Sequence, residues 1–452
     1  MKKRIIELID SKAKYFTDIA DYIWDNPELA FKEYKSSKAL TDALEENDFA
    51  VEKGLAGMPT AFKGVFGSGH PVIGFLAEFD ALSNMSQKYG VAHEEPVLTG
   101  AAGHGCGHNA IGTSCVAAAL AMKAVMEEEK LQGTVVVYGC PGEEGGAGKA
   151  FMARDGVFSD MDIAMAPHPS DNNFVMGISA LAVAHVEFRF KGKASHAGAA
   201  PHLGRSALDA CSLMIVGVQF LREHVIPEAR IHHAYLNVGG TAPNVVQADA
   251  SLLFYIRAPK SSQVKEISER INDIARGAAL MTGTTVEIVP HSGANNLLVN
   301  EVVGSTLASA WEEIGAQNFS KAAYDAAAVI TPAIPNCDVS APLDESIPTF
   351  KKQDTSMSGS TDVGDASYIA PTVMFMHTGF CKCTPGHSWQ LVAQSRSPIM
   401  HEGMLHAAKV MALTGLKFIK DPALVKAAWD EHKASGARYE CLIPEDVKPA
   451  ID

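Results

Sequence analysis

Residues 134–166, TVVVYGCPGEEGGAGKAFMARDGVFSDMDIAMA, carry the pattern that decides the fold. The β-branched run from Thr134 to Tyr138 predicts a strand, a short helix is expected around Lys149 to Arg154, and Asp162 to Ala166 predicts the next strand. Both strands are apolar throughout rather than alternating, which is typical of a parallel sheet covered on both faces. The stretch therefore predicts an α/β fold with a mostly parallel sheet.

The pattern changes near residue 182, where an alternating strand, LAVAHVEFRF, begins a second unit. The predicted order from there is strand, helix, strand, strand, helix, strand, which is the order of a ferredoxin-like unit. We therefore expect two domains. The larger one comprises residues 1–182 and 296–452, and residues 183–295 form a smaller domain inserted into it.

Composition excludes several classes of protein. The chain has 452 residues and a formal net charge of −14, so its mean field repels nucleic acid and anionic membranes. The N-terminal apolar residues are interrupted by Glu7, Asp10 and Lys12, unlike a signal peptide. Uncharged runs such as Ala110 to Met122 are shorter than the roughly 20 residues of a membrane span. We therefore expect a soluble, cytoplasmic protein whose eight cysteines are reduced.

The segment HGCGHN, residues 104–109, is the sharpest chemical signal. Cys106 and His108 are two residues apart, and the glycines beside them permit a turn that points both side chains at one metal. Asn109 is then expected to cap the helix that follows. The alternative is a glycine turn that holds an incidental cysteine and histidine. A dinucleotide-binding loop is disfavoured because no strand leads into GCGHNA and no acidic residue follows at the usual distance.

The adjacent acids Glu143 and Glu144 directly follow the strand TVVVYG. Adjacent residues cannot both point at one target from regular structure, so one carboxylate can bind a metal while the other faces the space beside it. Such a pair could supply a ligand and a general base. The alternative is a solvated acidic turn. A phosphate-binding loop is disfavoured because the glycine spacing differs and two carboxylates would repel phosphate.

Three more chemistry-bearing residues follow predicted strands: Asp80, His168 and His387. In open α/β sheets, ligands bind at the carboxyl ends of the strands. Each residue alone is more often an ordinary loop residue, but imidazole, thiol and carboxylate groups gathered at one sheet edge predict a metal centre. Mixed nitrogen, sulfur and oxygen ligands favour Zn²⁺ or Mn²⁺ over Mg²⁺ or Ca²⁺.

Together these motifs resemble a known family. The motifs are Asp80 at its strand end, HGCGHN, the EEGG turn, HPS at 168–170, SHAGAAPHLGRSALDA at 195–210 and TPGHSW at 384–389. They resemble the metallopeptidase family of aminoacylases, carboxypeptidase G and auxin-conjugate amidohydrolases, in particular its p-aminobenzoyl-glutamate hydrolase branch. The similarity extends over nearly the whole chain. It implies a catalytic α/β domain with two divalent metal ions, and an inserted ferredoxin-like lid for substrate contacts and dimerisation.

The resemblance also implies roles for individual residues. Glu143 corresponds to the general base, and Asp80 to the acid behind the metal site. The implied metal ligands are Cys106, His108, Glu144, His168 and His387. Two positions depart from many relatives, because Asn109 stands where they have Asp and Glu78 stands where they have Asp or His. These departures affect the surroundings of the metals and their preference.

In the lid, the resemblance implies that His196 stabilises the oxyanion, often across a dimer. Asn244 and Arg257 correspond to residues that hold the carboxylate of the substrate, which suits the two-pronged guanidinium of an arginine. For His196 the alternative is a polar turn residue, and for Arg257 it is a strand residue in a surface ion pair. The segment Ser360 to Asp365 is given no role.

The favoured hypothesis is a metal-dependent amidohydrolase of N-acyl or N-aroyl amino acids, with p-aminobenzoyl-glutamate as lead substrate, giving p-aminobenzoate and glutamate. Alternatives are a related amidohydrolase or dipeptidase acting on another conjugate, such as an indoleacetyl-amino acid, and a non-catalytic relative that only binds metal or ligand. A nucleotide-dependent enzyme is the weakest alternative. The expected assembly is a homodimer through the lid, with a second, non-identical subunit as an alternative.

Overall fold

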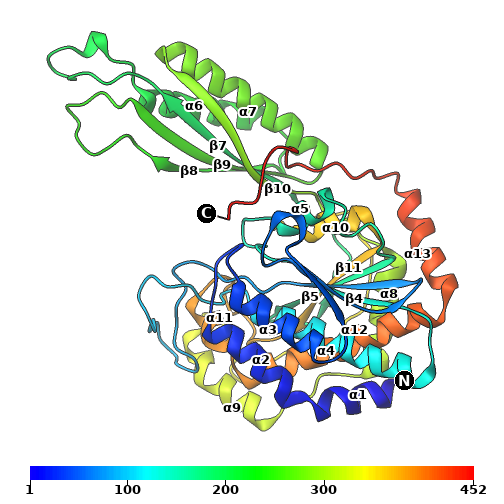
Figure 1. The fold of residues 1–452 in the computed structure, drawn as a ribbon. Helices are drawn as coiled ribbons and strands as arrows, with labels where there is room; N and C mark the ends of the chain where they lie inside the picture. The colour runs from blue at the N-terminus through cyan, green and yellow to red at the C-terminus, as the bar shows by residue number, and fades with distance from the viewer. Residues whose placement is uncertain (452) are drawn as a thin grey trace.

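The computed structural model describes residues 1–451 and contains two sheets (Figure 1). In the larger sheet the central strands β4, β3, β5 and β11 are parallel, and β1, β2 and β6 flank them in antiparallel pairing. The prediction of an α/β fold with a parallel sheet is confirmed for these central strands. The strands are β1 (Ala50–Lys53), β2 (Phe62–Ser68), β3 (Val72–Ala77), β4 (Gly133–Gly139), β5 (Ile163–Ser170), β6 (Phe174–Val175) and β11 (Thr372–Thr378).

Helices cover both faces of this sheet, which explains why its strands are apolar throughout. On β3, Ile73 and Phe75 belong to one hydrophobic core and Leu76 to the other. The first core is completed mainly by α1 (Lys2–Ser11), α2 (Ala13–Asp25), α3 (Tyr34–Glu45), α4 (His108–Glu129), α8 (Glu301–Ile314) and α12 (Pro398–Lys420). The second is completed mainly by α5 (Gly148–Arg154) and α10 (Val363–Ile369). The remaining helices are α9 (Lys321–Ile330), α11 (Trp389–Gln394) and α13 (Pro422–Ala434).

Helix α4 is longer than the uncharged run that predicted it. Its 22 residues make it long and apolar enough to cross a membrane by length and composition. However, 89% of its most apolar window is buried inside the protein, where it packs against the sheet. Such burial is the ordinary condition of a core helix.

The second sheet has four antiparallel strands in the order β10-β7-β9-β8. Helices α6 (Ala207–Leu221) and α7 (Ser261–Thr282) pack against one of its faces, and the unit projects from the larger part of the molecule (Figure 1). The element order along the chain is the predicted ferredoxin-like one. We refer to this unit as the lid. Its strands are β7 (Ala182–Lys191), β8 (Arg230–Asn237), β9 (Asp249–Ala258) and β10 (Thr285–Ala294).

Candidate metal centre

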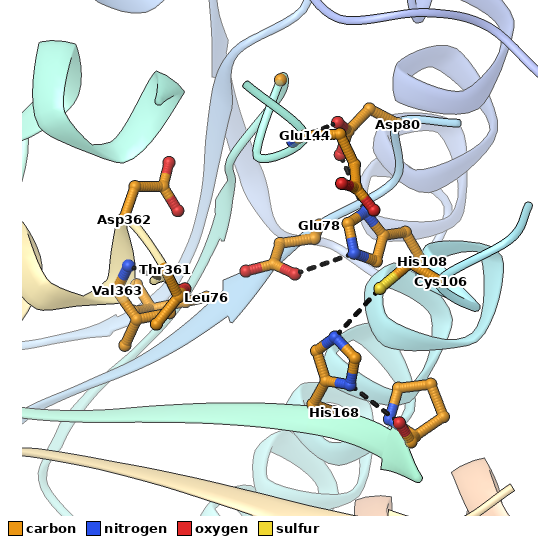
Figure 2. A network of polar contacts seen from close by, with 12 residues as sticks. Leu76, Glu78, Asp80, Cys106, His108, Glu144, His168, Thr361, Asp362 and Val363 are labelled. Atoms are coloured by element: carbon orange, nitrogen blue, oxygen red, sulfur yellow. Dashed lines mark hydrogen bonds and ion pairs between the residues drawn. The ribbon is translucent and has the colours of Figure 1, made fainter. Parts of the chain in front are cut away.

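Five of the residues expected at a metal site lie together at the carboxyl edge of the parallel strands. The Cys106 Sγ atom lies 3.4 Å from Nε2 of His168, and Figure 2 draws this contact. Nε2 of His387 lies 3.2 Å from Oε1 of Glu144. The ligand atoms of Cys106, His108 and His168 lie within 4.8 Å of one another, and so do those of Cys106, Glu144 and His387. Two three-residue groups therefore share the sulfur of Cys106.

Backbone geometry brings Cys106 and His108 to this edge. Gly107 has φ +77°, a left-handed conformation that favours glycine, and a Cβ atom there would lie 2.7 Å from Cγ of Pro169. Helix α4 begins at His108 with Gly107 as its N-cap. The expectation that Asn109 caps this helix is therefore wrong. The Asn109 side chain instead donates to the backbone oxygen of Ser395 at 2.9 Å, a structural contact inside the core.

Asp80 orients both halves of the site. Its Oδ1 atom lies 2.9 Å from Nδ1 of His108, and its Oδ2 atom accepts a hydrogen bond from the backbone N–H of Glu144 at 2.9 Å. Nε2 of His108 is buried and has no hydrogen-bond partner. On the other side of the cluster, Nδ1 of His168 lies 2.7 Å from the backbone oxygen of Pro169, so its Nε2 faces Cys106. Histidines held through one nitrogen present the other to a metal, so the donor set fits a divalent ion.

The charge state of Cys106 suits the same role. Burial alone would raise the pKa of its thiol, but the neighbouring imidazoles of His168 and His108 bring the pKa well below its ordinary range. The thiolate is the form of cysteine that binds metals. A ligand set that combines a thiolate, imidazoles and a carboxylate is typical of transition metals.

Glu143 lies beside the cluster but is not part of the two groups that share the sulfur. Its carboxylate is within 4.8 Å of ligand atoms of His108 and Glu144, and also of Glu78 and Asp362. Burial raises the pKa of Glu143 well above its ordinary range, and the negative charges of Glu78 and Asp362 add to the effect. A carboxyl group with a raised pKa beside a metal cluster can take up and release a proton.

Sequence reasoning missed three residues that support the turn carrying Glu143 and Glu144. Glu33 is fully buried and accepts hydrogen bonds from the backbone N–H groups of Gly142 and Phe31, each at 2.9 Å. Burial and the charge of Asp80 raise the pKa of Glu33 to about 8. Lys149 and Asp362 form a buried ion pair behind Glu143. No local pattern marks any of the three, because their burial depends on segments distant in the sequence.

The lid residues lie at opposite ends of the lid. Arg257 is opposite Val183 near the root of the lid, and its Nη1 atom donates to Oγ of Ser360 at 3.2 Å. Asn244 and His196 lie together in the distal loops, where the N–H of Ala197 donates to the backbone oxygen of Asn244. Strand β7, which runs between the two ends of the lid (Figure 1), has ten residues. At about 3.3 Å per residue, it separates the two ends by about 33 Å. Within one chain, Arg257 therefore lies at the end of the lid that is nearer to the metal cluster, whereas His196 and Asn244 lie at the far end.

Comparisons with known proteins give similarities over nearly the whole chain. Residues 178–281 match the peptidase dimerisation domain of the M20 peptidases. The chain is 41% identical to a p-aminobenzoyl-glutamate hydrolase subunit of Escherichia coli K12, over 99% of this chain and 98% of the relative. It is 31% identical to a mouse Xaa-Arg dipeptidase, over 96% and 92% of the two chains. A dinuclear metal-binding M20 peptidase from Bacillus subtilis has the same fold, with a TM-score of 0.59 at 17% identity over 91% and 99% of the chains.

Proposed function

The chain belongs to the M20 peptidase family of metal-dependent amidohydrolases, and we propose that it cleaves the amide bond of N-acyl or N-aroyl amino acids. The lead substrate is p-aminobenzoyl-glutamate, which would give p-aminobenzoate and glutamate. One observation carries the proposal: the Glu143 carboxylate lies beside the metal-ligand cluster without being part of the two groups that share Cys106. A hydrolase needs such a spare base, whereas a protein that only binds metal does not.

The proposed ligands are Cys106, His108, Glu144, His168 and His387, and they would hold two Zn²⁺ or Mn²⁺ ions. Bound divalent ions would lower the pKa of water and polarise the substrate carbonyl. Glu143 would accept the proton of the attacking water and return it to the leaving nitrogen. Asp80 would hold the His108 ring and the Glu144 backbone in fixed positions relative to each other through its two hydrogen bonds.

Recognition of the substrate would involve the lid. The Arg257 guanidinium lies near the root of the lid, and it would bind the carboxylate of the amino-acid half through two hydrogen bonds. His196 would donate a hydrogen bond to the oxyanion, and Asn244, which lies beside it, would contact the substrate. Because both lie about 33 Å along the lid from Arg257, we propose that the partner subunit supplies them.

This sharing requires a homodimer, and the lid offers a surface for one. Strand β8 is an edge strand, and it carries the exposed side chains of Tyr235 and Leu236. Nearby on α6, Phe220 is 73% exposed and Val216 is also exposed. An unpaired strand edge with exposed apolar groups is typical of a surface that another chain covers. A second, non-identical subunit remains the alternative, since the Escherichia coli relative is named as one subunit of its hydrolase.

We further propose that residues 1–182 and 296–452 form the catalytic domain, that residues 183–295 form the lid and dimerisation domain, and that the protein is cytoplasmic. A second candidate activity is that of a dipeptidase or of an amidohydrolase of another conjugate, such as an indoleacetyl-amino acid. The similarity to the mouse Xaa-Arg dipeptidase over nearly the whole chain favours the dipeptidase.

The test is release of free amino acid by the purified protein from a panel of p-aminobenzoyl-glutamate, indoleacetyl-aspartate, hippurate and Xaa-Arg dipeptides, with elemental analysis of the same sample. We expect p-aminobenzoyl-glutamate to give the highest kcat/KM and about two transition-metal ions per chain. If the metal-loaded protein releases no amino acid from any conjugate, the proposal fails. Higher kcat/KM on a dipeptide would establish the second candidate instead.

A further inference from the structure

Lys149 is completely buried although it carries a charge. It lies in the first turn of α5, five residues after Glu144. Its Nζ atom lies 2.6 Å from Oε1 of Glu78 and 2.6 Å from Oδ1 of Asp362. Its backbone N–H also donates to Oδ2 of Asp362 at 2.8 Å. The residue is thus tied to Asp362 at two points, and its ammonium also contacts Glu78.

Stability does not explain this arrangement. Removing each of these charges from water costs several kcal/mol, and apolar replacements of buried ion pairs are often neutral or stabilising. The location of the pair is more informative, because the carboxylates of Glu78 and Asp362 lie within 4.8 Å of Glu143, the proposed base. The buried Lys149 ammonium is therefore close enough to influence how the carboxylates beside the metal centre are placed.

Glu78 provides the connection to the metal centre. Its second oxygen, Oε2, lies 3.5 Å from Nε2 of His108. Figure 2 draws this contact as a dashed line. Asp80 occupies the other nitrogen of His108, so Nε2 is the atom left to face a cation. A divalent ion held by His108 would therefore be within reach of the Glu78 carboxylate, which is itself a good metal ligand.

We propose that Lys149 is a positioning residue that holds the Glu78 carboxylate out of the coordination sphere of the metal at His108. Because Asp362 anchors Lys149 at two points, the ammonium cannot follow Glu78 toward a metal ion. The restraint leaves a coordination position open on the side of Glu143. An open position is what distinguishes a catalytic metal site from a closed structural one. The proposal rests on the metal centre of the proposed function, but not on the identity of the substrate.

The test uses the Co²⁺-loaded protein, whose visible absorption reports the number of ligands. In Lys149→Met the freed Glu78 should bind the metal, and the d–d bands should weaken as the coordination number rises. Adding Glu78→Gln to this variant should restore the wild-type spectrum. With the native metal, Lys149→Met should lower kcat by about tenfold or more while KM changes by less than about threefold, because a position needed in the transition state is blocked.

A second pair of variants covers the case in which Lys149→Met does not fold. Lys149→Met/Asp362→Asn removes one positive and one negative charge together, so no unpaired carboxylate is left at position 362. It should show the same weakened bands, again restored by Glu78→Gln. Lys352→Met is the matched control, because Lys352 makes an exposed ion pair with Glu431 at the same 2.6 Å. Its spectrum and kcat should equal those of the wild type.

A folded, Co²⁺-loaded Lys149→Met protein with the wild-type spectrum would overturn the proposal. So would a weakened spectrum that Glu78→Gln does not restore. Both results are independent of substrate turnover. A wild-type protein that is inactive on every conjugate would contradict only the proposed function.

Discussion

His108 and Asp80 are held 2.9 Å apart, from Nδ1 to Oδ1, although 28 residues separate them in the chain. The contact leaves Nε2 of His108 free within a buried cluster of thiol, imidazole and carboxylate groups. The second oxygen of Asp80 reaches the backbone of Glu144. One carboxylate thus aligns the start of α4 with the turn after β4 that carries the two adjacent acids.

This relationship predicts a loss of metal affinity in Asp80→Ala. Without its partner, the His108 ring can rotate, and removal of such supporting groups typically weakens metal binding about 10- to 100-fold. Competition with a chromophoric chelator measures the change. Asp338→Ala is the control, because Asp338 is an acid whose hydrogen bonds stay within its own exposed loop. Equal metal affinity in Asp80→Ala and the wild type would contradict the orienting role.

Glu143→Gln should remove catalysis and leave the metals in place. Glutamine cannot accept the proton of water, and general bases contribute about 10²- to 10⁴-fold to turnover. The measurement is kcat on p-aminobenzoyl-glutamate together with metal content. Glu144→Gln provides the contrast, because loss of a proposed ligand should lower the metal content as well. A metal-loaded Glu143→Gln protein with wild-type kcat would rule out this residue as the base.

A site shared between subunits predicts complementation between two inactive variants. Glu143→Gln lacks the base and His196→Ala lacks the lid donor, so each homodimer is inactive. When the two are co-expressed in equal amounts, half of the dimers are mixed, and each mixed dimer has one complete site. Activity should recover to about a quarter of the wild-type value. Recovery to no more than the sum of the two variants would show that each chain uses its own His196.

Dimer formation should depend on the exposed face of α6. Phe220→Glu places a charge where an apolar side chain would be covered by the partner, and burying an unpaired charge is strongly unfavourable. Light scattering should show a monomer, with activity lost and the melting temperature of the monomer little changed. Ser212 is also exposed and lies one turn before Val216 on the same face of the helix, so Ser212→Glu tests how far along α6 the covered surface extends. Dimers that persist in Phe220→Glu would exclude this face.

Acid sensitivity should decrease when His406 is replaced. Burial lowers the pKa of His406 to about 4 from its ordinary value of 6.5, with a smaller contribution from Lys409. The folded protein keeps this ring neutral, whereas the unfolded chain takes up a proton below about pH 6.5. The stability due to neutral His406 is therefore complete above that pH and is lost as the pH falls toward about 4.

The variant His406→Leu should not show this acid-induced loss of stability. The free energy of unfolding of the variant should fall by about 2 kcal/mol less than that of the wild type between neutral pH and about pH 4.5. Urea unfolding of both proteins at a series of pH values gives the comparison. Parallel curves for the two proteins would show that His406 does not titrate differently in the folded and unfolded states.

Local sequence was sufficient to predict the fold and to mark candidate residues for a metal site, whereas the roles of the individual ligands came from the resemblance to a known family. Apolar runs such as Thr134 to Tyr138 are typical of strands covered on both faces, and parallel strands bring their carboxyl ends to one edge. For this reason Cys106, His168 and Glu144 could be expected to meet before any contact was known. The order of strands and helices after residue 182 was likewise sufficient to predict the lid.

Tertiary structure alone decided which charges are buried and how far apart the lid residues lie. Lys149 looks like an ordinary surface lysine of a short helix, and its pairing with Asp362, 213 residues away, arises only because α5 packs against α10. His196 and Arg257 appear in sequence as two residues of one small domain, yet the length of an extended strand separates them. Periodicity specifies local backbone structure, whereas burial and distance between remote residues depend on how the elements pack.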